Sequence, residues 1–243
     1  MEKVLLVTGA SSDIGIELVK KIGSEYGMIY LQYRTMNERL EHLIQELEQT
    51  TQVVPLKADL LKLDEVRGVI KAIEDNGVFP NHFVHLPAQK AYNKQFHKDQ
   101  WENFEQGWTI SVRSISEILK VFIPRMVKQR YGRIVLMLTS CTHERPPKYQ
   151  SSYVTVKYAL LGLMKALAVE YADKGITVNG ISPDMMETKF LSELPELIVM
   201  KNREKSPLGR NVSVDEVLPV IMYMLSDVGG AITGQNIVIS GGI

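Results

Sequence analysis

The chain has 243 residues, a length that suits one large α/β domain with a substantial buried core. Its 28 Lys and Arg balance its 28 Asp and Glu, so no overall basic field attracts nucleic acid or an anionic membrane. The one cysteine, Cys141, cannot form an intramolecular disulfide and fits a reducing compartment. The first strand begins too early for a signal peptide, and no apolar run reaches the length of a membrane span. We therefore expect a soluble cytoplasmic protein.

Short apolar runs alternate with amphipathic segments along the whole chain. The apolar runs predict β-strands at Val4–Val7, Met28–Tyr33, Val53–Leu56, His82–Leu86, Ile134–Leu138, Thr177–Ile181 and Asn236–Ile239. The amphipathic segments predict helices, including Met36–Glu48, Leu63–Asp75, Trp101–Gln129 and Ser152–Asp173. This alternation predicts a doubly wound, Rossmann-type parallel sheet with helices on both faces. No repeat or linker interrupts it, so we expect a single domain.

The first predicted strand runs into a turn that carries two glycines and then into a helix. Glycine is needed where the backbone takes a positive φ or approaches a phosphate closely. A strand, a glycine-bearing turn and a helix N-terminus together favour binding of a pyrophosphate. The expected phosphate-binding residues are Gly9, Ser11, Ser12, Asp13, Ile14 and Gly15.

A serine, a tyrosine and a lysine follow the fifth predicted strand. Tyr153 and Lys157 are four positions apart, so they share one face of a helix, and Ser140 can reach that face from the end of the strand. A phenol, a cation beside it and a hydroxyl are the groups that reduction of a carbonyl requires at neutral pH. The alternative interpretation is an exposed helical pair with a serine that caps the strand.

These motifs, in this order, resemble the short-chain dehydrogenase/reductase family, in the branch that includes 3-oxoacyl-[acyl-carrier-protein] reductases. The resemblance extends from Val4 to Gly242. It is carried by Thr8-Gly9-x-x-x-x-x-Gly15, Ala58-Asp59-Leu60, Ser140, Tyr153-x-x-x-Lys157, Thr177-Val178-Asn179, Pro183, Thr188 and the tail from Ile232-Thr233-Gly234-Gln235 to Gly241-Gly242. It implies an NAD(P)-dependent oxidoreductase that assembles as a homotetramer or homodimer through the helix of Tyr153 and the chain end.

The resemblance also implies roles for single residues. Tyr153 donates the proton to the carbonyl oxygen, Ser140 holds that oxygen, and Lys157 holds the nicotinamide ribose. Thr188 fixes the carboxamide and Asp59 faces the adenine, although a cap on the next helix is an alternative role for Asp59. Leu60, Pro183 and Met186 complete the expected cofactor site. Residues 184–210 are interpreted as a flap over the substrate, the alternative being a surface excursion.

The second predicted strand ends without the acidic residue that usually holds the ribose 2′-hydroxyl of NAD. Arg34 follows that strand instead, and a guanidinium can bind the 2′-phosphate of NADP with two hydrogen bonds. The sequence therefore favours NADP over NAD. The alternative is that Arg34 is an ordinary solvated charge. We further expect the Lys157 ammonium and the oxidised nicotinamide ring to lower the pKa of Tyr153 from about 10.

The sequence departs from the family pattern at four sites, one of which is a stretch of four residues. Asp13 replaces a glycine of the phosphate turn, so its carboxylate must point away from the pyrophosphate. The stretch His85-Leu86-Pro87-Ala88 stands where Asn-Asn-Ala-Gly is usual, and Asp184 replaces the glycine after Pro183. Ser111 aligns with the asparagine that starts a proton relay to the lysine, and we include it among the catalytic candidates. These departures leave open a second hypothesis, a cofactor-binding sensor or assembly protein with weak activity.

The substrate is predicted only by resemblance, as a 3-oxoacyl thioester or a similar small ketone. Arg125, Lys128, Arg130 and Arg133 form a basic cluster that we place near the rim of the site, where it could meet an acyl carrier protein. The alternative is a solvated helix C-terminus. Val169, where carrier-binding relatives have arginine, counts against the carrier. The histidines show no spacing typical of metal ligands, so we predict no metal.

Overall fold

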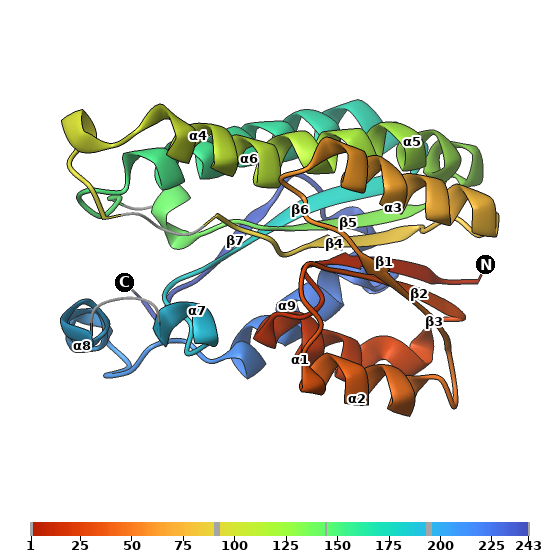
Figure 1. The fold of residues 1–243 in the computed structure, drawn as a ribbon, viewed down its shortest axis with the longest axis horizontal. Helices are drawn as coiled ribbons and strands as arrows, with labels where there is room; N and C mark the ends of the chain where they lie inside the picture. The colour runs from red at the N-terminus through yellow and green to blue at the C-terminus, as the bar shows by residue number, and fades with distance from the viewer. Residues whose placement is uncertain (1, 90–92, 144, 193–195, 243) are drawn as a thin grey trace.

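The computed structural model describes residues 2–89, 93–143, 145–192 and 196–242. Its centre is one parallel sheet with the strand order β3-β2-β1-β4-β5-β6-β7 (Figure 1). The strands are β1 (Val4–Thr8), β2 (Met28–Tyr33), β3 (Gln52–Lys57), β4 (His82–His85), β5 (Gly132–Met137), β6 (Ile176–Pro183) and β7 (Asn236–Ile239). The order reverses between β1 and β4, which in open α/β sheets creates a crevice beyond the carboxyl ends of the strands. The doubly wound fold is confirmed.

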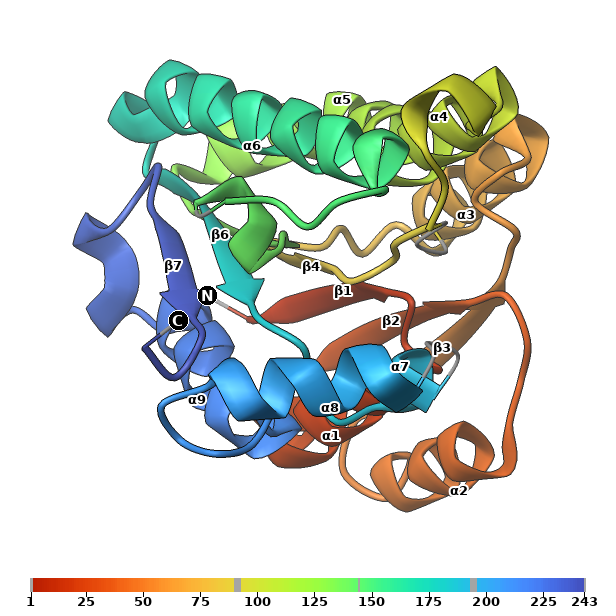
Figure 2. The same cartoon turned by 90° about the vertical axis from the view of Figure 1, so that its left-hand side faces the viewer.

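Helices cover both faces of the sheet, as Figures 1 and 2 show. One face carries α3 (Leu63–Asn76), α4 (Trp101–Trp108), α5 (Ser114–Gln129) and α6 (Ser151–Tyr171). The opposite face carries α1 (Asp13–Ile22), α2 (Glu38–Leu47) and α9 (Val214–Leu225). The predicted helix Trp101–Gln129 is therefore two helices, because a π-helical turn at Thr109–Arg113 separates α4 from α5.

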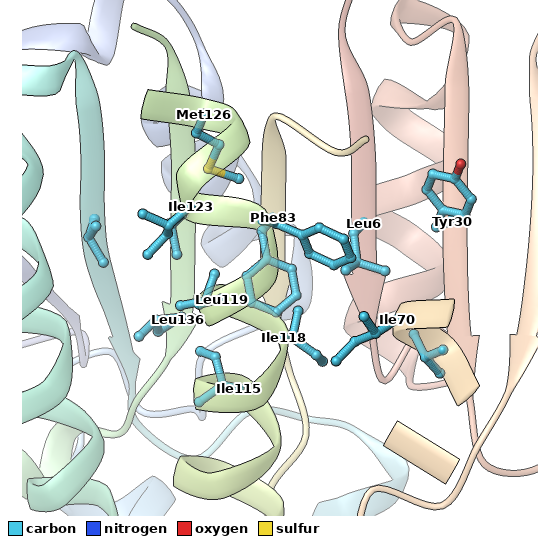
Figure 3. Close-up of a cluster of buried hydrophobic side chains, with 14 of the residues drawn as sticks. Leu6, Tyr30, Ile70, Phe83, Ile115, Ile118, Leu119, Ile123, Met126 and Leu136 are labelled. Carbon is cyan, nitrogen blue, oxygen red and sulfur yellow. The ribbon is translucent and has the colours of Figure 1, made fainter. Parts of the chain in front are cut away.

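Each face of the sheet has its own apolar core, since alternate side chains of a strand point to opposite faces. Leu6 and Phe83 pack against α3 and α5, where they meet Ile70, Ile118 and Leu119 (Figure 3). Leu5 and Val7, the neighbours of Leu6, belong to the core formed with α1, α2 and α9. These two cores fix the strands and so fix the positions of the residues that follow their carboxyl ends.

Two short helices lie beyond the carboxyl ends of the strands, α7 (Lys189–Ser192) and α8 (Glu196–Lys205) (Figures 1 and 2). The sequence pattern indicated neither helix, because α8 has no buried residue among those described, and a helix without an apolar face leaves no periodic pattern.

The segment Ser151–Lys174 is long and apolar enough to cross a membrane, with a mean hydropathy of 1.3 over its most apolar window. One such helix is weak support for a membrane protein, because the core helix of a soluble protein meets the same criterion. This helix packs on β6 and contributes Leu160, Met164 and Ala168 to the core. Only 33% of its apolar window is buried, however.

Candidate active site

The turn after β1 has the geometry that its glycines predict. Gly9 has φ +74°, and a Cβ atom at Gly15 would lie 2.8 Å from the carbonyl oxygens of Gly9 and Ala10. Ser12 caps α1, because its hydroxyl accepts a hydrogen bond from the Gly15 N–H at 3.1 Å and donates one to Gly9 O at 2.7 Å. The backbone is thus held tightly at the positive end of the α1 dipole.

Asp13 points away from this turn toward α7. Its Oδ1 pairs with the guanidinium of Arg39, which also binds Glu17 at 2.8 Å. Its Oδ2 accepts a hydrogen bond from the Lys189 N–H, at the start of α7, at 2.7 Å. Asp13 therefore links the glycine-bearing turn to α2 and to α7. The sequence did not indicate Arg39, since nothing local shows which acid it meets.

Gln32 and Arg34, near the end of β2, have different roles. Gln32 is buried, and its amide bridges Gly9 N (3.0 Å) and Ala58 O (2.7 Å), which ties β1, β2 and the end of β3 together. Arg34, two residues later, is exposed and has no hydrogen bond or ion pair with any described residue. Its guanidinium is thus available to an external anion.

The structure brings Tyr153, Lys157 and Ser140 to one place. Lys157 is 1% exposed, and its Nζ donates a hydrogen bond to Met137 O, the last residue of β5, at 2.7 Å. Nζ lies 5.8 Å from the centre of the Tyr153 ring. Ser140 is buried three residues beyond β5. The lysine is therefore fixed by the strand whose extension carries the serine.

The pKa values of the pair differ from the sequence expectation. Burial raises the pKa of Tyr153 to about 12, with partial opposition from a hydrogen bond with Thr139. Burial also lowers the pKa of Lys157 to about 8. In the protein alone, loss of hydration therefore outweighs any stabilisation of the phenolate by Lys157. Tyr153 is protonated at neutral pH, which is the state that a proton donor needs.

The hydroxyl of Ser140 already has a partner in this structure. It donates a hydrogen bond to Asp184 Oδ1 at 3.0 Å. The other carboxylate oxygen, Oδ2, accepts one from Asn202 Nδ2 at 2.7 Å, and Asn202 belongs to α8. The sequence identified Ser140 and noted Asp184 as a departure, but not their contact.

Ser111 lies in the π-helical turn, and its buried hydroxyl has no hydrogen-bond partner among the described residues. Insertions of this kind often occur at functional sites.

His85 replaces the usual asparagine at the end of β4. Its Nδ1 contacts Thr8 Oγ1 at 2.8 Å, while its buried Nε2 makes no hydrogen bond of normal geometry. Burial lowers the pKa of His85 to about 3, and the nearby Lys157 charge acts in the same direction.

An open cleft of about 880 Å³ lies between α1, α2, α7 and α8. Asp13, Arg39 and Thr188 line it. Ser140 and Tyr153 do not line it, so it is the part of the crevice beside the phosphate turn.

The other expected cofactor residues differ in their burial. Pro183 ends β6, and Met186 is partly buried. The side chain of Leu60 belongs to the core, so only the backbone of Leu60 is placed to contact a ligand. Asp59 accepts a hydrogen bond from Leu61 N at 3.0 Å and does not cap α3, whose N-cap is Lys62.

The predicted position of the basic cluster is wrong. Arg130 follows α5 and Arg133 is the second residue of β5, so both lie at the amino ends of the strands, opposite Ser140. Arg133 is 6% exposed and donates hydrogen bonds to Gly132 O and Gly175 O. Arg125 stacks on Phe79 at 4.3 Å. These cations stabilise the fold at that end and do not surround the active site.

The residues present fit a dinucleotide cofactor. A side chain at Gly15 would fill the space where the turn meets α1, and the positive φ of Gly9 is specific to glycine. The carboxylate of Asp13, the one acid in the turn, is neutralised by Arg39. Arg34, which has no ion-pair partner among the described residues, places a cation just after β2, where a ribose phosphate would bind.

Comparisons with known proteins agree with this geometry. The chain is 30% identical to 3-oxoacyl-[acyl-carrier-protein] reductase FabG of Aquifex aeolicus, across 99% of this chain and 97% of the relative. It is 28% identical to the FabG of Thermotoga maritima, across 99% of this chain and 97% of that protein.

Solved structures show the same fold. YwfH, an NADPH dependent reductase involved in bacilysin biosynthesis, superimposes with a TM-score of 0.88 at 19% identity, covering all of this chain and 98% of YwfH. NAD⁺-bound xylitol dehydrogenase superimposes with a TM-score of 0.87 at 24% identity, covering 99% and 98% of the two chains. Residues 9–243 match the family model described as Enoyl-(Acyl carrier protein) reductase. The chain belongs to the short-chain dehydrogenase/reductase family and is an NAD(P)-dependent oxidoreductase.

Proposed function

We propose that the protein is an NADPH-dependent carbonyl reductase that transfers hydride to a ketone. The observation that carries this proposal is the placement of Tyr153 and Lys157 on α6, with Lys157 Nζ held by Met137 O at 2.7 Å, beside the extension of β5 that bears Ser140. NADPH supplies the hydride, and the side chains supply the proton and hold the oxygen.

Each side chain has a defined task in this proposal. Tyr153, with its pKa raised to about 12 by burial, keeps its proton until negative charge develops on the carbonyl oxygen. Ser140 donates a hydrogen bond to the same oxygen and stabilises that charge. Lys157 keeps a positive charge near the phenol, which favours the phenolate left after proton transfer. The buried Ser111 hydroxyl and His85 Nε2 are polar groups that a water molecule would satisfy on the path to Lys157.

The proposed preference for NADP rests on Arg34, with Gly9, Ser12 and Gly15 holding the pyrophosphate. We expect Arg34→Ala to weaken NADPH binding by about tenfold or more, because charge-assisted hydrogen bonds to the 2′-phosphate are lost. NADH binding should change less than about twofold. Fluorescence titration of both nucleotides measures this, with Arg67→Ala, an exposed arginine on α3, as the control. Equal losses for NADPH and NADH would remove the argument for NADP.

The substrate class proposed first is a 3-oxoacyl thioester, because the curated relatives bear the name of 3-oxoacyl-[acyl-carrier-protein] reductase. Acetoacetyl-CoA tests this class without a carrier. The corrected position of Arg130 and Arg133 removes the surface first suggested for an acyl carrier protein, so the carrier stays a proposal that rests on the relatives alone.

We further propose that the protein is cytoplasmic and assembles as a homodimer or homotetramer through α6. This helix is apolar on most sides but only partly buried, and Tyr158 and Val169 are 46% and 82% exposed. Apolar exposure of this kind marks an interaction surface. The α6 helix of a second copy would cover these apolar side chains, because a two-fold symmetric contact pairs the same surface of both copies.

A charge placed in that surface tests the assembly. We expect Val169→Glu to shift the protein to a smaller species in sedimentation analysis, because a buried unpaired carboxylate destabilises the interface. Leu197→Glu, which places the same charge at a 62% exposed position on α8, should leave the oligomer unchanged. A wild-type protein that sediments as a monomer would contradict the proposal.

A further inference from the structure

Asp184 places a carboxylate directly beside the hydroxyl expected to hold the substrate. It follows Pro183 at the end of β6, and its Oδ1 lies 3.0 Å from Ser140 Oγ. Its Oδ2 lies 2.7 Å from Asn202 Nδ2 on α8, and the same amide is 3.2 Å from Asn211 Oδ1. Asp184 therefore connects Ser140 to α8 through its two carboxylate oxygens.

Among the residues that the structure describes, the charge of this carboxylate has no cationic partner. Ser140 and Asn202 are neutral donors, and no described Lys, Arg or His forms an ion pair with Asp184. Asp184 is also half-buried, so water compensates its charge only in part. A carboxylate accepts hydrogen bonds and donates none. The group that complements it best is a hydrogen-bond donor, and a cationic donor above all.

Substrate binding removes a hydrogen bond from Asp184. Ser140 can donate only one hydrogen bond, so when its hydroxyl donates to a substrate oxygen it no longer donates to Asp184 Oδ1. Asp184 Oδ1 then lacks a donor, although Oδ2 keeps its hydrogen bond from Asn202, and the carboxylate lies beside an oxygen on which negative charge develops. Both effects oppose the reduction of a ketone with no donor near its carbonyl. A substrate with such a donor replaces the lost hydrogen bond and screens the charge.

We propose that Asp184 is a specificity-determining residue that favours ketones with a hydrogen-bond donor on the carbon next to the carbonyl, an ammonium group most and a hydroxyl next. The two oxygens at Ser140 and Asp184 are one hydrogen-bond length apart, which suits two adjacent polar atoms of one small ligand. This inference rests on the proposed ketone reduction and narrows its substrate, since an ordinary 3-oxoacyl chain has no donor there.

Four small ketones of similar size test the proposal with NADPH and the full chain. Hydroxyacetone and aminoacetone carry a donor, whereas methoxyacetone and butan-2-one do not, and methoxyacetone retains the electron-withdrawing oxygen of hydroxyacetone. We expect kcat/KM for hydroxyacetone to exceed that for methoxyacetone by about tenfold, the ratio that one such hydrogen bond supplies. The kcat/KM for aminoacetone should exceed that for hydroxyacetone.

The variant Asp184→Asn keeps the size of the side chain and removes its charge. We expect the preference for hydroxyacetone over methoxyacetone to fall to about twofold or less, with the advantage of aminoacetone lost. Asp184→Gly, which restores the usual family residue, should behave in the same way if the asparagine variant does not fold. Asp75→Asn, at an exposed position on α3, is the matched control and should keep the wild-type ratios.

The outcomes separate this proposal from the one it rests on. Equal kcat/KM for all four ketones in the wild type, or a preference that survives in both Asp184 variants, overturns the role of Asp184 and leaves ketone reduction standing. A wild type that reduces none of these ketones, nor acetoacetyl-CoA, overturns the proposed function and this inference with it.

Discussion

Replacement of Tyr153 by phenylalanine should lower kcat for ketone reduction by about a thousandfold, the contribution typical of a positioned general acid. The substitution removes one oxygen atom and keeps the aromatic ring of this α6 residue. With its pKa raised to about 12 by burial, the Tyr153 phenol is protonated at neutral pH, and the centre of its ring lies 5.8 Å from Lys157 Nζ. NADPH affinity should change by less than about threefold, because the phosphate turn and Arg34 are untouched.

Steady-state kinetics and a separate NADPH titration measure both quantities. Tyr158→Phe is the matched control, since Tyr158 lies on the same helix, is 46% exposed and should tolerate loss of its hydroxyl. A Tyr153→Phe enzyme with near wild-type kcat would show that another group donates the proton. A large loss of NADPH affinity would instead assign Tyr153 to cofactor binding.

Acid should destabilise the folded protein steeply below about pH 6.5, because two histidines are buried in their neutral form. His82 is fully buried between Tyr26 (2.8 Å from Nδ1) and Tyr131 (2.9 Å from Nε2). Burial lowers the pKa of His82 to about 3, and it lowers the pKa of His85 to about 3 as well. In the unfolded chain both have a pKa near 6.5.

The sign of the pH dependence of the unfolding free energy follows from the protons that the two states bind. Between pH 6.5 and 3 the unfolded chain binds protons at both histidines and the folded protein does not, so the free energy of unfolding falls with falling pH. The contribution is fully present above about pH 6.5. Below about pH 6.5 each histidine lowers the free energy of unfolding by about 1.4 kcal/mol per pH unit, and the two together lower it by about 3 kcal/mol per pH unit.

Urea unfolding at pH 7, 6 and 5 measures this slope. We expect His85→Asn, which introduces the usual family residue, to reduce it by about half, because one of the two buried bases is removed. His97→Gln, at an exposed position, should leave it unchanged. A wild-type unfolding free energy that stays constant between pH 7 and 5 would contradict the neutral burial of His82 and His85.

The sequence predicted those features that depend on local pattern. Each strand is a short apolar run, and the Gly9–Gly15 turn and the Tyr153–Lys157 spacing are signals within a few residues. The carboxyl ends of the strands in a doubly wound sheet lie at one edge, so the sequence alone predicts Ser140 beside α6. The fold and the main catalytic candidates are therefore readable from the chain.

Features that depend on distant contacts or on burial could not be predicted. Ser140, Asp184 and Asn202 meet from three elements, and no spacing connects them. The direction of the Tyr153 pKa shift depends on how much hydration the phenol loses, which a sequence does not state. Arg133 follows α5 closely in the chain but lies at the opposite end of the sheet from Ser140, because β5 separates the two.

The rate of NADPH oxidation by the wild-type protein with acetoacetyl-CoA and the four small ketones, with NADH run alongside, tests the central claim most directly. The proposed function predicts turnover with at least one ketone and a preference for NADPH. Tight NADPH binding without turnover of any ketone would contradict it and would favour a cofactor-binding sensor, in which Asp184 keeps the Ser140 hydroxyl from a substrate.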